Sequence, residues 1–185
     1  LGTGTSFTTP SISTTTTFYA EAVNSGCNSV RVPIVATVNS TPSITSTTDL
    51  TICGNVGGTL SATTSAGTVY WYTVASGGTS FATGTSIPVS GSSYTFYAEA
   101  VSNGCTSARV PVVYTSIPYP AITSVNSASR CGNGSLTLLA SSDFGVVNWY
   151  DSPTGGNLLA TGTSFITPPL TNTTSYYVEA VNNNC

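Results

Sequence analysis

The chain repeats its own sequence with a period of about 78 residues, and a fixed period of this kind predicts tandem copies of one module. Residues 18–23 read Phe-Tyr-Ala-Glu-Ala-Val, residues 96–101 are identical, and residues 176–181 read Tyr-Tyr-Val-Glu-Ala-Val. In such an array each module contacts only its neighbours. Arrays of this kind are typical of spacers, scaffolds and multivalent binders, and far less so of enzymes.

A second motif, Thr-Gly-Thr-Ser followed by an apolar residue, recurs in step with the first and gives the same alignment. It predicts three repeats: a partial one over residues 1–41, a complete one over 42–119, and a third over 120–185 that lacks its last strand. Because the first repeat is incomplete, we expect the sequence to be an internal piece of a longer protein. The junctions are short and contain proline, so we expect semi-rigid connections and a rod-like array.

Within a repeat, short clusters of strand-forming residues alternate with turn signals such as Gly57-Gly58 and Gly77-Gly78. No segment shows the apolar period of an amphipathic helix. Regular short strands separated by frequent turns predict an all-β fold of tandem immunoglobulin-like β-sandwiches, with about seven strands in the complete repeat.

The five cysteines keep the period of the repeats. Cys27 and Cys105 are one period apart, as are Cys53 and Cys131, and Cys185 follows Cys105 by slightly more than one period. No two cysteines are close in sequence and the chain has no histidine, so a zinc site is not expected. We predict disulfides within repeats, Cys53–Cys105 and Cys131–Cys185, which leave Cys27 to a partner upstream of this sequence. Structural disulfides indicate an oxidising compartment.

Trp71 and Trp149 follow the first cysteine of their repeat at the same distance and lie between strand-forming residues. A buried tryptophan on the third strand is a hallmark of immunoglobulin-like domains, so we predict that both lie in the core. The alternative is an exposed aromatic surface that stacks on sugar rings, for which Tyr70, Tyr72 and Tyr150 are the neighbouring candidates.

Two charged pairs recur near the ends of repeats, Glu21 with Arg31 and Glu99 with Arg109. The members of each pair are equidistant from a turn that contains glycine, so they can face each other across a β-hairpin. We interpret them as exposed cross-strand pairs, each worth roughly a few tenths of a kcal/mol, and not as a binding site.

Composition argues against several classes of function. The chain has no His or Lys, three Arg and a net charge of −3, and no apolar run reaches the ~20 residues of a transmembrane helix. Neither a Ser–His–Asp nor a Ser–Lys catalytic arrangement can form without those residues. Nucleic-acid binding needs a basic patch, and calcium binding or glycoside hydrolysis needs clustered carboxylates. We therefore expect no catalytic residue, no metal and no cofactor.

Several short motifs follow one another in a fixed order, and related sequences cover the whole chain. They are Cys-Gly early in a repeat, Trp-Tyr in its middle, then Gly-Thr-Ser-Phe, Thr-Ser-Tyr-Tyr-Val-Glu-Ala, and Asn-Gly-Cys-Thr-Ser-Ala-Arg-Val-Pro-Val. In combination they resemble the immunoglobulin-like repeats of giant Bacteroidota surface proteins, which are adhesins and gliding-associated proteins exported by the type IX secretion system. The resemblance implies an extracellular location on the bacterial outer surface.

The function expected on these grounds is that of stalk repeats in a very long surface protein that acts in adhesion, gliding or surface filaments. Its partners would be neighbouring repeats of the same chain, with surface polysaccharide or another surface protein as the ligand. The alternative hypothesis is an accessory carbohydrate-binding module of a secreted enzyme, which would need exposed aromatic side chains in a line on one sheet.

Overall fold

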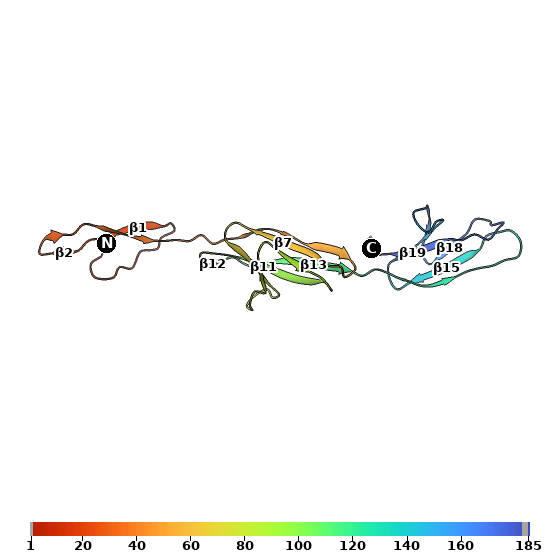
Figure 1. Ribbon diagram of the computed structural model, residues 1–185, viewed down its shortest axis with the longest axis horizontal. Coiled ribbons are helices and arrows are strands. Elements are labelled where there is room, and N and C mark those ends of the chain that lie inside the picture. Colours follow the sequence, from red (N-terminus) through yellow and green to blue (C-terminus); the bar gives the residue numbers. More distant parts are fainter. Residues whose placement is uncertain (1, 183–184) are drawn as a thin grey trace. The chain divides into compact units, whose positions relative to one another are not determined.

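The structure of the protein is a computed structural model, which describes residues 2–182 and Cys185. Every regular element in this part of the chain is a β-strand, which confirms the all-β prediction (Figure 1). Among these residues no helix has the length and apolar character needed to cross a bilayer. The chain comprises two compact units: residues up to Thr47 with Ala62–Thr85 and Tyr97–Pro111, and Thr48–Ser61 with Ser86–Phe96 and Val112–Cys185.

The middle repeat is a two-sheet β-sandwich. Its strands are β5 (Ile44–Thr48), β6 (Leu50–Cys53), β7 (Gly58–Thr64), β8 (Thr68–Tyr72), β9 (Ala82–Thr83), β10 (Ser86–Val89), β11 (Tyr94–Ser102), β12 (Cys105–Thr106) and β13 (Val110–Ile117). One sheet has the order β10-β7-β5, and the other has the order β6-β13-β11-β8-β9 with β12 paired to β11. This division of strands matches the A, B, E and C, F, G strands of an immunoglobulin sandwich.

The third repeat has the same plan with fewer strands. They are β14 (Ile122–Asn126), β15 (Thr137–Ser142), β16 (Val146–Tyr150), β17 (Leu158–Thr161), β18 (Ser164–Ile166) and β19 (Tyr177–Val181). Sheet β14-β15-β18 faces sheet β17-β16-β19 around a core of Ala140, Val147, Trp149 and Phe165. Among the described residues this repeat has no counterpart of β13.

The first repeat contributes two hairpin segments. Strands β1 (Thr16–Ala20) and β4 (Val32–Ala36) pair antiparallel, and the short strands β2 (Val23–Asn24) and β3 (Cys27–Asn28) form the hairpin tip. Ser25 and Gly26 both have positive φ, at 51° and 82°, which fits a two-residue type I′ turn. By sequence alignment these strands correspond to β11, β13 and the hairpin tip of the middle repeat.

Each tryptophan of the chain lies in the core of its repeat. Trp71 is 0 % exposed and Trp149 is 3 % exposed, on the equivalent strands β8 and β16. Their neighbours Tyr70 and Tyr72 on β8 are half-buried, because alternate side chains of a strand point to opposite faces of the sheet.

Candidate functional site

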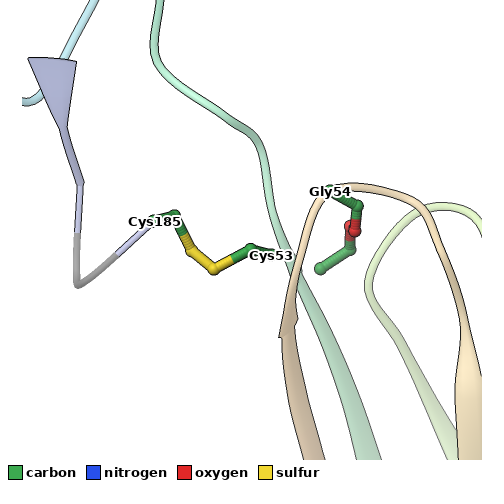
Figure 2. The surroundings of a disulfide bond; sticks show 4 residues. Cys53, Gly54 and Cys185 are labelled. Atoms are coloured by element: carbon green, nitrogen blue, oxygen red, sulfur yellow. A yellow bond between two sulfur atoms is a disulfide. The ribbon is translucent and has the colours of Figure 1, made fainter. Parts of the chain in front are cut away.

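A disulfide joins two successive repeats of this chain. This bond distinguishes the chain from a string of independent domains. Cys53, at the end of β6 in the middle repeat, is bonded to Cys185, which follows β19 in the third repeat; their Cα atoms are 5.5 Å apart. Figure 2 shows this bond joining two segments that are 132 residues apart in sequence. We call it the inter-repeat disulfide.

This bond corrects the pairings expected from the sequence, Cys53 with Cys105 and Cys131 with Cys185. Cys105 and Cys131 are free thiols, as is Cys27. The reason lies in the direction of β13. Cys53 is in register with Ile117 at the end of this strand, whereas Cys105 lies in the hairpin tip that precedes Val110. A strand of this length spans about 23 Å at ~3.3 Å per residue, and disulfides need Cα atoms within about 7 Å.

Strand pairing and hydrogen bonds hold Cys53 in place. Strand β6 runs parallel to β13, and the backbone N–H of Gly54 donates to the carbonyl oxygen of Ile117 at 2.7 Å. The Ser116 hydroxyl donates to the carbonyl oxygen of Gly54, also at 2.7 Å. The cysteine is therefore fixed to the last residues of the repeat, immediately before the chain passes into the next one.

Glycine is required after Cys53. Gly54 has a φ of 69°, in the left-handed region, and a Cβ there would lie 2.5 Å from the ring of Tyr119 in the junction between repeats. A side chain would therefore be strained and would also displace Tyr119. The Cys-Gly motif noticed in the sequence thus has a local structural cause at the inter-repeat disulfide.

Comparison with protein-family models matches the chain in three successive segments, residues 1–39, 40–118 and 119–185, to the family described as Ig-like domain CHU_C associated. The segments cover the whole sequence. The chain belongs to this Ig-like domain family. A comparison with curated proteins found no match.

The two charged pairs of the Ig-like domains differ in their surroundings. Arg31 and Glu21 form an ion pair at 3.0 Å on an open surface, where Arg31 is 69 % exposed. Arg109 and Glu99 form the same contact, at 3.0 Å, but their side chains are only 12 % and 13 % exposed. The expectation of two exposed pairs is therefore wrong for the second one.

Arg109 is buried because it holds the loop that follows β8. Its guanidinium group donates to the carbonyl oxygens of Val74 and Gly77, each at 2.7 Å, and lies over the ring of Tyr72 with 3.3 Å between Cζ and the ring centroid. One arginine thus joins a carboxylate, a loop backbone and an aromatic face. Its role in this Ig-like domain is structural.

This contact also bears on the sugar-stacking hypothesis. The Tyr72 ring is covered by Arg109, and the hydroxyl of Tyr150 donates to Oε1 of Glu179 at 2.7 Å. That hydrogen bond raises the pKa of Tyr150. Two of the three candidate tyrosines are thus held by side chains of their own Ig-like domain.

A cavity in the third Ig-like domain has a volume of about 790 Å³. Leu138, Trp149 and Tyr176 line it together with Arg130, and the segment around Arg130 is the counterpart of β6. In the middle domain β6 pairs with β13, for which the third domain has no counterpart among the described residues. We assign no ligand to this cavity.

Within the described residues, no group of three or more His, Cys, Asp and Glu side chains is placed to hold a metal ion. The acidic side chains near loops act on the backbone: Asp49 accepts from Val113 N–H and Asp143 from Ala121 N–H, both at 2.8 Å. Asp151 accepts from the side chain and the backbone N–H of Asn157, and these bonds lower the pKa of its carboxyl group. These carboxylates order loops of the Ig-like domains.

Proposed function

We propose that this chain is a force-bearing segment of a long extracellular surface protein, in which disulfides join successive Ig-like domains. The observation that carries the proposal is the bond between Cys53 of one domain and Cys185 of the next. Tandem domains alone would suit a flexible string, whereas a covalent bond across the junction between the second and third repeats limits how far these two domains can separate. A rod-like stalk that holds an adhesive tip away from the cell needs such a limit.

The bond changes how a pulling force travels along the chain. Residues 54–184 lie inside the loop that the disulfide closes, so a force applied at the two ends passes from Cys53 directly to Cys185. Unfolding of the domains inside the loop then releases no length. In the chain-entropy model, a loop of this size also raises the free energy of unfolding by about 5 kcal/mol.

The same bond and the family support the proposed location. Persistent disulfides form in oxidising compartments, and the bacterial cell exterior is one of them. The Ser- and Thr-rich surface supplies neutral hydroxyl groups instead of charge. We place the protein on the bacterial outer surface, in adhesion, gliding or a surface filament, with many equal repeats giving avidity through their spacing.

Single-molecule pulling between the two ends tests the force-bearing role. With the disulfide intact, we expect unfolding to release only the length outside the loop. Reduction, or the paired variant Cys53→Ser with Cys185→Ser, should add roughly 450 Å of contour length at ~3.5 Å per residue. A matched control is Cys27→Ser, which removes a free thiol outside the loop. Equal lengths before and after reduction would overturn the proposal.

Small-angle scattering tests the stalk role separately. Chains with two, three and four copies of residues 42–119 should have maximum dimensions that grow nearly in proportion to copy number. A maximum dimension that stays constant would contradict a stalk even if the disulfide holds. Retention of the chain on a polysaccharide column, abolished by Tyr70→Ala, would favour the carbohydrate-binding hypothesis instead.

A further inference from the structure

We propose that Cys105 is one half of a second inter-repeat disulfide, whose other half is the first cysteine of the preceding repeat. The resulting rule is that the first cysteine of each repeat bonds to the second cysteine of the repeat that follows. The rule goes beyond the proposed function, because it fixes the covalent pattern of an array whatever the array adheres to.

Cys105 occupies the position in its repeat that Cys185 occupies in the next. Its Sγ atom lies 3.9 Å from the carbonyl oxygen of Asn39, and the Asn39 side chain donates to the carbonyl oxygen of Asn103 at 3.0 Å. The hairpin tip that carries Cys105 is therefore seated on the last residues of the first repeat.

Asn39 is the counterpart of Ile117, since the two are one period apart in the sequence. Ile117 is the residue in register with Cys53, the cysteine that is bonded to Cys185. Cys105 thus lies against the residue of the first repeat beside which a cysteine of the β6 type would stand. The equivalent place one repeat further along already contains a disulfide.

The edge of β4 near Asn39 is also unpaired among the described residues, and a strand on this edge would carry the cysteine that bonds to Cys105. Among the described residues β4 pairs with β1 alone, whereas its counterpart β13 also pairs with β6. Ile34 on β4 is 57 % exposed, and its counterpart Val112 on β13 is 0 % exposed. We assign this edge to one occupant, a strand equivalent to β6 that runs parallel to β4 and ends in a cysteine at Asn39.

An ordinary thiol oxidant accepts the electrons released when this disulfide forms. Two thiols lose two protons and two electrons to form one S–S bond, and the disulfide of an oxidised thiol compound accepts both and becomes two thiols. Extracellular assembly supplies such oxidants, and oxidised glutathione serves in vitro. The intermediate exposure of Cys105 leaves its thiol accessible for this exchange.

The rule also implies that successive loops overlap, since Cys131 precedes Cys185 in sequence. Cys131 is exposed and free, and the rule assigns it to the second cysteine of a repeat that follows Cys185 in an array. Under the rule, each junction between repeats lies within at least one disulfide loop.

The experiment adds to the first repeat the segment that carries a cysteine equivalent to Cys53. Residues 42–80 are fused ahead of Leu1 in the full chain, with the added copy marked by Thr51→Ser, and the protein is refolded with oxidised glutathione. Non-reducing peptide mapping should find the added cysteine bonded to Cys105, with the Cys53–Cys185 bond retained. In the same fusion with Cys105→Ser, the added cysteine should stay free.

Two results would overturn the proposal: a bond between the added cysteine and Cys27, or an added cysteine and Cys105 that both remain free in folded protein. Folding is checked by tryptophan fluorescence. If the fusion does not fold, a second variant carries an extra marked copy of residues 42–119 inserted before Pro42. There, the marked Cys53 should bond to the unmarked Cys105, and a bond to the marked Cys105 would refute the rule.

Discussion

The indole N–H of Trp71 donates a hydrogen bond to the carbonyl oxygen of Gly84 over 2.8 Å. Trp149 makes the same bond to Gly162, also over 2.8 Å and also 13 residues along the chain. Both glycines have positive φ, at 116° and 110°, and both begin the Gly-Thr-Ser motif that recurs in the sequence. In the middle and third repeats the motif therefore supplies the hydrogen-bond acceptor of the core tryptophan.

Replacing Trp71 should lower the free energy of unfolding through two separable losses, the buried ring and the hydrogen bond to Gly84. Trp71→Ala should lower the free energy of unfolding by about 3–5 kcal/mol, because it removes the largest fully buried side chain of the middle repeat. Trp71→Phe keeps much of the ring but leaves the Gly84 carbonyl oxygen without this donor, so we expect a smaller loss of about 1–3 kcal/mol. Denaturant unfolding followed by circular dichroism measures both, and unchanged midpoints would place Trp71 outside the core.

The buried arginine should be intolerant of a substitution that its exposed counterpart accepts. Arg109→Lys keeps the charge but cannot serve the Glu99 carboxylate and two loop carbonyl oxygens from one planar group. We expect a loss of about 1–3 kcal/mol in the free energy of unfolding, since the part-buried Glu99 carboxylate and the two loop carbonyl oxygens lose donors. The matched control Arg31→Lys lies on an open surface and should change stability by less than about 0.5 kcal/mol. Similar effects at both positions would show that burial is not the cause.

The hydroxyl group of Tyr114 should be dispensable. Tyr114 on β13 is 1 % exposed, and its hydroxyl oxygen has no hydrogen-bond partner in the described structure. A buried polar group without a partner is destabilising. Tyr114→Phe should therefore leave stability unchanged or raise it by up to about 1 kcal/mol, measured by thermal or denaturant unfolding. A clear loss would mean that a bound water or another group serves this hydroxyl.

The all-β fold could be predicted from the sequence because the recurring motifs align the repeats with one another. The position of Trp71 between strand residues, at a fixed distance after a cysteine, predicts the strand and its buried face from local information alone. The burial of Arg109 was not predictable in this way. It depends on the loop from Val74 to Gly77 folding back over a hairpin much further along the chain, which no local pattern records.

The prediction of the cysteine pairing was wrong for a different reason. The period of the repeats is equally compatible with a bond inside a repeat and with a bond from one repeat to the next, since either choice recurs once per repeat. Only the strand directions decide between them. Assigning Leu50–Cys53 as a strand parallel to the last strand would have placed Cys53 and Cys105 at opposite ends of the sandwich.

Limited trypsin digestion of the unaltered protein distinguishes the two pairings. The chain has no lysine, so trypsin can cut only after its three arginines. Arg109 is buried in its ion pair, whereas Arg31 and Arg130 are exposed and are the expected sites. A cut after Arg31 removes a segment that contains only the free Cys27.

The cut after Arg130 is the informative one, because it separates Cys53 from Cys185 along the backbone. With the inter-repeat disulfide, residues 131–185 stay attached to the preceding fragment until a reducing agent is added. With a bond between Cys131 and Cys185, the same segment would separate without reduction. We therefore expect non-reducing electrophoresis to show no loss of this segment, and Cys53→Ser to release it. Release from the unaltered protein would contradict both the inter-repeat disulfide and the force-bearing role that depends on it.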